Sequence, residues 1–211
     1  MSTPSDMGAP SDRPTVVCVV GSPRPAGNTS YLVDVAIDEF TRRGARCEKI
    51  LLSEYRIMPC EGHDDCADFA ACPIDDDTSL VLDKVYSADA VLLASPVYYE
   101  DVSGQMKVFI DRNCHNYSHE VWLKARTVGL LAVAESTGLD ETIDTLRRYV
   151  SFSSNGTLRP FVVTGKAAKM GDIAGDADTI AAVKKMVAAM MATVLARDAA
   201  DDAAAARASQ G

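Results

Sequence analysis

The chain has 211 residues, of which 47% are hydrophobic and 24% charged, and its formal net charge is −9. This length suits one well-packed domain, and the composition is that of a globular protein. The negative charge argues against a nucleic acid or an anionic membrane as partner, because a phosphate-rich surface would repel the chain. No apolar run in the sequence approaches the roughly 20 residues that a membrane span needs.

The two ends of the chain have the composition of unstructured segments. Residues 1–13 are rich in Ser, Asp and Pro and contain no apolar stretch, which indicates a disordered arm and not a signal peptide. Residues 198–211 form an Ala-rich tail that is expected to fray, so the domain is expected to span residues 14–197. A cytoplasmic location is expected, in which the six cysteines stay reduced.

Apolar segments alternate with amphipathic helical patterns along this domain. Residues 15–20 form a β-branched run without polar alternation, as a strand buried on both faces should. Four further strands are predicted at residues 46–52, 90–94, 128–133 and 158–164, the first of them more polar and suited to a sheet edge. Helical stripes are predicted at residues 32–40, 139–146 and 180–194.

This alternation predicts an α/β fold with a doubly wound parallel sheet and helices on both faces. Such a sheet binds its ligand beyond the carboxyl ends of the strands, where the strand order reverses. The functional residues are therefore expected in the loops that follow the apolar segments.

The loop after the first predicted strand has the features of a phosphate-binding site. It reads Gly-Ser-Pro-Arg-Pro-Ala-Gly-Asn-Thr-Ser over residues 21–30, where a helix begins. A strand-to-helix turn aims free backbone N–H groups and the positive end of the helix dipole at one point. The side-chain donors in the loop are Ser22, Arg24, Asn28, Thr29 and Ser30. An ordinary helix cap is the alternative interpretation. Neither G-x-G-x-x-G nor G-x-x-x-x-G-K-[ST] is present here, so a single phosphate fits better than a pyrophosphate.

The loop after the third predicted strand completes a family pattern. Residues 95–107 read Ser-Pro-Val-Tyr-Tyr-Glu-Asp-Val-Ser-Gly-Gln-Met-Lys, followed by Val-Phe-Ile-Asp-Arg at 108–112. Together with residues 21–30, this segment resembles the NADPH-dependent FMN reductase and iron–sulfur flavoprotein branch of the flavodoxin-like superfamily. The resemblance implies a five-stranded parallel sheet in the order 2-1-3-4-5, with FMN as cofactor and NAD(P)H as co-substrate.

The resemblance also implies where the flavin contacts the chain. The first loop would bind the FMN phosphate, and the segment Pro96, Val97, Tyr98 and Tyr99 would run along the isoalloxazine ring, to which tyrosines offer flat faces. The alternative is that the tyrosines only close the core. Lys107, Asp111 and Arg112 are interpreted as holding the following helix and a subunit contact.

A third loop follows the fourth predicted strand and contains Ser136, Thr137 and Gly138. By resemblance it borders the pyrimidine end of the ring, where donors would stabilise the negative charge of reduced flavin. The same residues are also typical of a capped helix start.

A cysteine-containing insertion is predicted at residues 57–77. Its pattern is C-x2-H-x2-C-x5-C, formed by Cys60, His63, Cys66 and Cys72. The resemblance implies a C-x2-C-x2-C-x4–7-C run that holds a [4Fe–4S] cluster here, and His63 stands where the second cysteine belongs. A cubane is normally held by four thiolates. A metal-free insertion is therefore favoured over a zinc or unusual cluster site and over a redox-sensing thiol pair.

The remaining candidates in this part of the chain have simpler interpretations. Residues 75–77 are three aspartates that would cap the following helix, where negative charge suits the dipole. Cys18 and Cys47 lie in strand patterns and are interpreted as core residues. Cys114, His115 and His119 could bind a metal, but a solvated helix end is favoured.

The sequence thus predicts an enzyme that passes electrons from NAD(P)H through FMN in a ping-pong scheme to a quinone, flavin, nitro or azo compound, as a homodimer or homotetramer. The alternative is an iron–sulfur flavoprotein that carries single electrons with ferredoxin as partner. A flavin-binding sensor without turnover is the third possibility. No catalytic side chain is assigned, because hydride transfer to flavin needs no protein acid or base.

Overall fold

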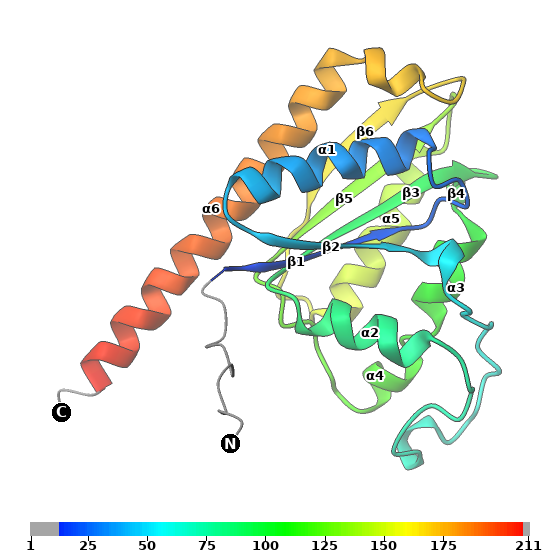
Figure 1. The fold of residues 1–211 in the computed structure, drawn as a ribbon. Helices are drawn as coiled ribbons and strands as arrows, with labels where there is room; N and C mark the ends of the chain where they lie inside the picture. The colour runs from blue at the N-terminus through cyan, green and yellow to red at the C-terminus, as the bar shows by residue number, and fades with distance from the viewer. Residues whose placement is uncertain (1–12, 209–211) are drawn as a thin grey trace, which may run out of the picture.

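The computed structural model describes residues 13–208, and the side chains of residues 13–196. Its centre is a twisted sheet whose parallel strands follow the order β2-β1-β3-β5-β6, which confirms the predicted 2-1-3-4-5 arrangement (Figure 1). A short strand paired antiparallel to β3 makes a sixth. The strands are β1 (Thr15–Val20), β2 (Arg46–Leu51), β3 (Ala90–Tyr98), β4 (Asp101–Val102), β5 (Thr127–Ala134) and β6 (Phe161–Lys166).

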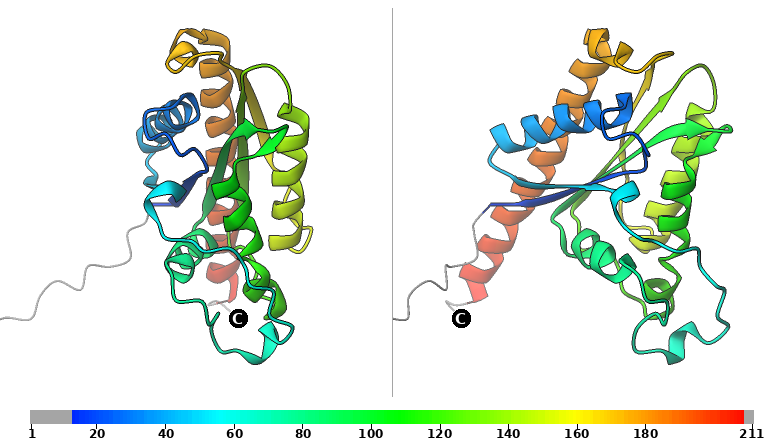
Figure 2. Two further views of the ribbon diagram at one scale, coloured as in Figure 1. Left: turned by 90° about the vertical axis from the view of Figure 1, so that its right-hand side faces the viewer. Right: turned by 45° about the vertical axis from the view of Figure 1, so that its right-hand side comes forward.

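Helices cover both faces of the sheet (Figure 2). Val16, Cys18 and Val20 of β1 point to one face, where they join a core cluster with the first and last helices. Val17 and Val19 point to the opposite cluster. The period of two along a strand buried on both faces explains why the sequence shows no polar alternation here. The helices are α1 (Asn28–Arg42) and α6 (Ala177–Ala208) on the first face, and α2 (Thr78–Ser87), α3 (Gly104–Asp111) and α5 (Leu139–Ser153) on the second.

Several elements differ from the prediction or add to it. The fifth parallel strand begins at Phe161 and not at residue 158, because Pro160 directly precedes it. A short helix follows α3, and single turns interrupt three loops. These elements are α4 (Cys114–Ser118), η1 (Leu52–Glu54), η2 (Cys66–Asp68) and η3 (Asp172–Gly175).

The last helix is longer than the sequence pattern indicates. The expected fraying tail continues α6 as helix as far as Ala208, whereas the expected N-terminal arm lies almost wholly outside the described residues. Part of this helix, Ala177–Ala196, is long and apolar enough to cross a membrane, by length and composition alone. Its uninterrupted apolar run is shorter, because Asp178, Lys184 and Lys185 lie within these residues.

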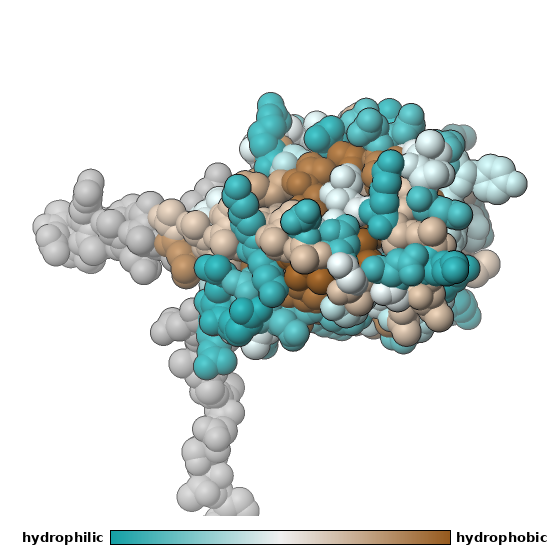
Figure 3. Space-filling view, turned by 90° about the horizontal axis from the view of Figure 1, so that it is seen from above, coloured by the Kyte–Doolittle hydropathy of each residue, from teal (hydrophilic) through white to brown (hydrophobic). Residues whose placement is uncertain are grey.

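The apolar residues of α6 pack against the rest of the protein and not against a membrane. Its valines and methionines are buried against the sheet and α1, at Val183, Met186, Val187, Met190, Met191 and Val194. Seen from above, hydrophilic side chains surround strips of hydrophobic surface over the helical layer (Figure 3).

Candidate functional site

The loops that follow β1 and β3 are fastened together at the carboxyl edge of the sheet. The amide of Gly21 donates to Ala94 O at 2.8 Å, and Ser103 Oγ donates to Gly21 O at 2.6 Å. A Cβ at Gly21 would lie 2.8 Å from the Met106 side chain and 2.9 Å from Ser103 Oγ. Only glycine therefore allows this close approach, which brings the two loops into one site.

A cavity of about 260 Å³ opens at this edge. Four segments contribute to its lining: residues 22–29, 96–98, 133–135 and 167–170. They follow or end β1, β3, β5 and β6, so the cavity lies at the reversal point of the strand order. Its volume is below the roughly 300–1,000 Å³ that is usual for an enclosed ligand, so a flavin bound here would stay partly exposed.

The first turn of α1 is an open anion cradle beside the cavity. Its N-cap is Gly27, no side chain caps the free amides, and the turn contains no acidic residue. The hydroxyl of Ser30 is buried but has no hydrogen-bond partner among the described residues. Arg24 lines the cavity with an exposed side chain. Free amides, an unpaired hydroxyl and a nearby cation fit a phosphate group, which is what FMN would present here.

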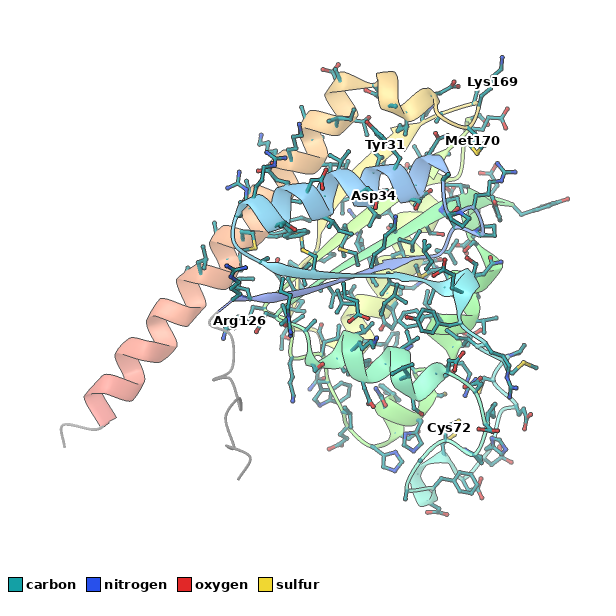
Figure 4. All side chains as sticks on the ribbon, viewed as in Figure 1. Tyr31, Asp34, Cys72, Arg126, Lys169 and Met170 are labelled. Carbon is teal, nitrogen blue, oxygen red and sulfur yellow. The ribbon has the colours of Figure 1, made fainter. Side chains whose placement is uncertain are left out.

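Two of the predicted first-loop residues make contacts within the protein. Ser22 Oγ accepts from the amide of Arg24 at 3.1 Å and so shapes the loop. The side-chain amide of Asn28 donates to Lys169 O and accepts from the Gly171 amide, each at 2.8 Å. Asn28 therefore clamps the loop after β6, whose Lys169 and Met170 are exposed at the end of the sheet (Figure 4). That Ser22 and Asn28 also touch phosphate stays a prediction.

The segment expected along the flavin ring, residues 96–99, ends in a tight turn that directs its last residue away from the others. Pro96, Val97 and Tyr98 line the cavity. Tyr99 and Glu100 form the two-residue turn between β3 and β4, with φ of +50° and +64°. Positive φ at both positions is typical of the type I′ hairpin turn, which usually takes Asn-Gly. The Tyr99 side chain is fully exposed at the turn and does not line the cavity.

The third predicted loop supports this hairpin. Thr137 Oγ1 donates to Glu100 Oε1 at 2.6 Å. Gly138 has φ of +82°, and a Cβ there would lie 2.7 Å from Glu100 Cα. Thr137 and Gly138 thus lie next to the turn, and the cavity lining contains Glu135 in place of Ser136, Thr137 and Gly138. Their contact with a flavin stays a prediction.

The sequence interpretation missed one segment of the lining. Residues 167–170 follow β6 and close one side of the cavity. The signal was available, because the loop after the fifth predicted strand must end at the same sheet edge as the other three loops. It was overlooked because Ala, Lys and Met are not typical of a binding motif.

The cysteine segment is joined to the core by a buried ion pair. Arg112 bonds to Asp76, and both side chains are only 1% exposed. Burial alone would raise the pKa of Asp76, but the hydrogen bonds from Arg112, Met58 N and Thr78 N outweigh it and lower the pKa to about 2. Arg112 is therefore an internal residue and not the subunit contact expected of it. Asp76 also supplies the expected bond to the first turn of α2.

Metal ligands are not gathered around a single point in the described part of the chain. No group of three His, Cys, Asp or Glu side chains there could hold one metal ion. All six cysteines are free thiols. Cys18 is buried and Cys47 half-buried, as expected of strand residues, and burial raises the pKa of both thiols.

A larger cavity lies away from the strand ends. It measures about 530 Å³ and is lined mainly by apolar residues of α3, α4 and α5 and of the loop after α4. Because it has neither an open helix N-terminus nor a place at the strand reversal, it is the weaker candidate for a nucleotide site.

Known proteins are similar to this chain in sequence and in fold. A model of the NADPH-dependent FMN reductase family matches residues 14–169. An iron–sulfur flavoprotein of Methanocaldococcus jannaschii is 41% identical over 98 residues, 46% of this chain and 51% of that protein. One of Archaeoglobus fulgidus is 39% identical over 127 residues, 60% of this chain and 57% of that protein. The chain thus matches little more than half the length of these relatives.

A solved structure extends the likeness to the fold. RosB, crystallised with bound 8-demethyl-8-formylriboflavin-5′-phosphate, aligns with a TM-score of 0.69 at 16% identity, covering 93% of this chain and 86% of that one. At this identity the likeness shows a common fold. Since the family model covers nearly three quarters of the sequence, the protein belongs to the NADPH-dependent FMN reductase family.

Proposed function

We propose that the protein is an FMN-dependent NAD(P)H oxidoreductase of the cytoplasm that works in a ping-pong scheme. One observation carries the proposal: the uncapped first turn of α1 begins at a cavity at the strand reversal, which Gly27, Asn28 and Thr29 line, and the buried hydroxyl of the next residue, Ser30, is unpaired among the described residues. Membership of the reductase family supports FMN as the ligand. When bound, FMN supplies the redox chemistry by taking a hydride equivalent from NAD(P)H and passing electrons on.

The protein's own contribution is binding and orientation. The amides of the first turn of α1, with Thr29, Ser30 and Arg24, would hold the phosphate. Pro96, Val97 and Tyr98 would lie along the ring, and Ser103 Oγ holds their loop against the first loop through Gly21 O. The open side of a cavity of about 260 Å³ leaves room for NAD(P)H and then for an acceptor in turn. A quinone, free flavin, nitro or azo compound fits this scheme as acceptor.

The first test is a visible spectrum of the anaerobic protein with FMN, before and after NADPH. We expect bound flavin that NADPH bleaches and that a quinone restores. Bound flavin that neither NADPH nor NADH bleaches would instead support a sensor without turnover. Failure to bind FMN would contradict the whole proposal.

A variant tests the proposed role of Ser30 separately from activity. Ser30→Ala removes a buried hydroxyl that has no partner in the flavin-free protein, so its free energy of unfolding should not fall. The same change should weaken FMN binding roughly tenfold if the hydroxyl donates to the phosphate. Ser79→Ala, at an exposed position on α2, is the matched control, measured by fluorescence titration and urea unfolding. Unchanged FMN affinity in Ser30→Ala would remove Ser30 from the site.

We also infer a homodimer or homotetramer. Tyr117, Val121 and Phe152 are 55%, 44% and 62% exposed at the rim of the 530 Å³ cavity, which Trp122 also lines. Contiguous exposed aromatic surface of this kind is typical of subunit contacts.

A further inference from the structure

Two cysteine-bearing segments that are distant in sequence meet in the fold. The helix α4, which begins at Cys114, packs against η2, which begins at Cys66. Figure 1 shows the segment of residues 60–72 alongside α4. In the sequence they are separate candidates, because about forty residues and the whole of α2 and β3 lie between them.

Residues on either side of Cys114 fix this contact. Arg112 Nη2 donates to Cys72 Sγ at 3.5 Å, and Arg112 Nη1 donates to Met58 O at 2.8 Å. His115 Nε2 lies 3.0 Å from Phe69 O. The C-cap of α3 and the first turn of α4 are therefore both bonded to the cysteine segment, one on each side of Cys114.

The thiol of Cys66 is within electrostatic reach of three other thiols. Burial raises the pKa of Cys66, and repulsion from the thiols of Cys114, Cys60 and Cys72 raises it further, with Cys114 the strongest of the three. Cys66 thus has three cysteine neighbours, and one of them comes from α4.

His63, by contrast, directs its imidazole elsewhere. Its Nε2 lies 3.6 Å from Glu61 Oε2, and its ring stands edge to face against Phe69 with 5.7 Å between the ring centroids. Its contact with Cys66 is through the backbone, where Cys66 Sγ lies 3.5 Å from His63 O.

The chemistry of the donors distinguishes a cluster from a single ion. A zinc ion draws its sulfur ligands to about 2.3 Å from one point. In a cubane cluster each thiolate binds a different iron, so the sulfurs stand farther apart. No three ligand side chains in the described part of the chain are arranged for one ion, and the thiols of Cys60, Cys72 and Cys114 act electrostatically on Cys66. Four thiolates are the donor set that a cubane takes.

We propose that Cys60, Cys66, Cys72 and Cys114 together hold a [4Fe–4S] cluster, with Cys114 of α4 supplying the fourth thiolate in place of His63. The ligand set is then complete in spite of the histidine in the sequence motif. The buried guanidinium of Arg112 is a positioning group, because it donates to Cys72 Sγ and so orients that side chain. The proposal stands independently of flavin binding.

The test is anaerobic reconstitution of the full chain with ferrous iron and sulfide. Iron, acid-labile sulfide and zinc are then measured per chain. An electron paramagnetic resonance spectrum is recorded after reduction with dithionite. We expect about four irons and four sulfides per chain. Cys114→Ser should lose at least half of both and change the resonance spectrum. His63→Ala should retain them, as should Cys47→Ser, a control for removal of a half-buried thiol outside the segment.

The circular dichroism spectrum of every variant reports folding and so distinguishes loss of the cluster from loss of the fold. The amount of bound FMN is measured separately and so distinguishes loss of the cluster from failure of the reductase proposal. Full iron and sulfide in Cys114→Ser would overturn the ligand assignment. Loss of both in His63→Ala alone would return the fourth position to the histidine. Stoichiometric zinc, or no iron in the unaltered protein, would overturn the cluster itself.

Discussion

At the scale of single residues, the ion pair of Asp76 and Arg112 is buried on both sides. Both side chains are 1% exposed, so removal of one partner leaves the other charged and buried without compensation. Asp76→Ala should lower the free energy of unfolding at neutral pH by about 3–5 kcal/mol. Asp75→Ala, at the neighbouring exposed position, should change it by less than about 0.5 kcal/mol in the same urea titration.

The same pair predicts a dependence of stability on pH. The pKa of Asp76 is lowered from 3.8 to about 2, so its contribution is fully present above pH 3.8 and is lost as the pH falls toward 2. The loss amounts to about 2 kcal/mol, and Asp76→Ala should not show it. Equal acid sensitivity in the two proteins would assign the lowered pKa to some other group.

At the scale of elements, the hairpin between β3 and β4 is strained for its sequence. Tyr99 and Glu100 both have positive φ, a conformation that costs ordinary residues about 1 kcal/mol or more each. Tyr99→Asn should therefore raise the free energy of unfolding by about 0.5–1 kcal/mol, because Asn tolerates this conformation. Tyr117→Asn, also at an exposed tyrosine but without positive φ, should not stabilise the protein.

FMN titration of Tyr99→Asn tests the other half of this argument. Because the Tyr99 side chain is fully exposed and outside the cavity lining, FMN affinity should stay within about twofold of the unaltered protein. A much larger loss would restore the interpretation from the sequence, in which Tyr99 lies along the ring.

Elements with a local signal could be predicted from the sequence, and elements defined by distant contacts could not. β1 and β5 are continuous apolar runs. The first loop ends in Asn, Thr and Ser, which are typical of a helix N-terminus. The Tyr-Glu turn has no turn signal, so β4 went unpredicted. The clamp of Asn28 on Lys169 joins residues 141 positions apart, and an Asn at a helix start is equally typical of a cap.

At the scale of the whole molecule, the described surfaces divide by function. Strand ends and α1 form the candidate flavin site, whereas α4 and the cysteine segment lie at another part of the fold (Figure 1). The larger cavity between α3, α4 and α5 lies away from the strand ends and meets the cysteine region at Cys114, which lines it. Such a division leaves one extended face for association with a second copy.

Phe152 is the residue through which that association can be tested. It is 62% exposed on α5, and its ring stands edge to face with Tyr117 of α4 at 6.0 Å between centroids. A charge placed there would be desolvated by a partner subunit, at a cost of several kcal/mol. Phe152→Glu should therefore shift the mass in light scattering from oligomer to monomer.

The control for this change is Leu195→Glu, at a position that is 51% exposed on α6, away from the apolar face. Leu195→Glu should leave the oligomer intact. Both variants should keep the unfolding midpoint of the isolated subunit, because neither Phe152 nor Leu195 belongs to the core clusters. If Leu195→Glu dissociates the oligomer and Phe152→Glu does not, the subunit contact belongs to α6. A homotetramer with two kinds of contact would instead fall to a dimer in Phe152→Glu, because only one of its interfaces contains this face.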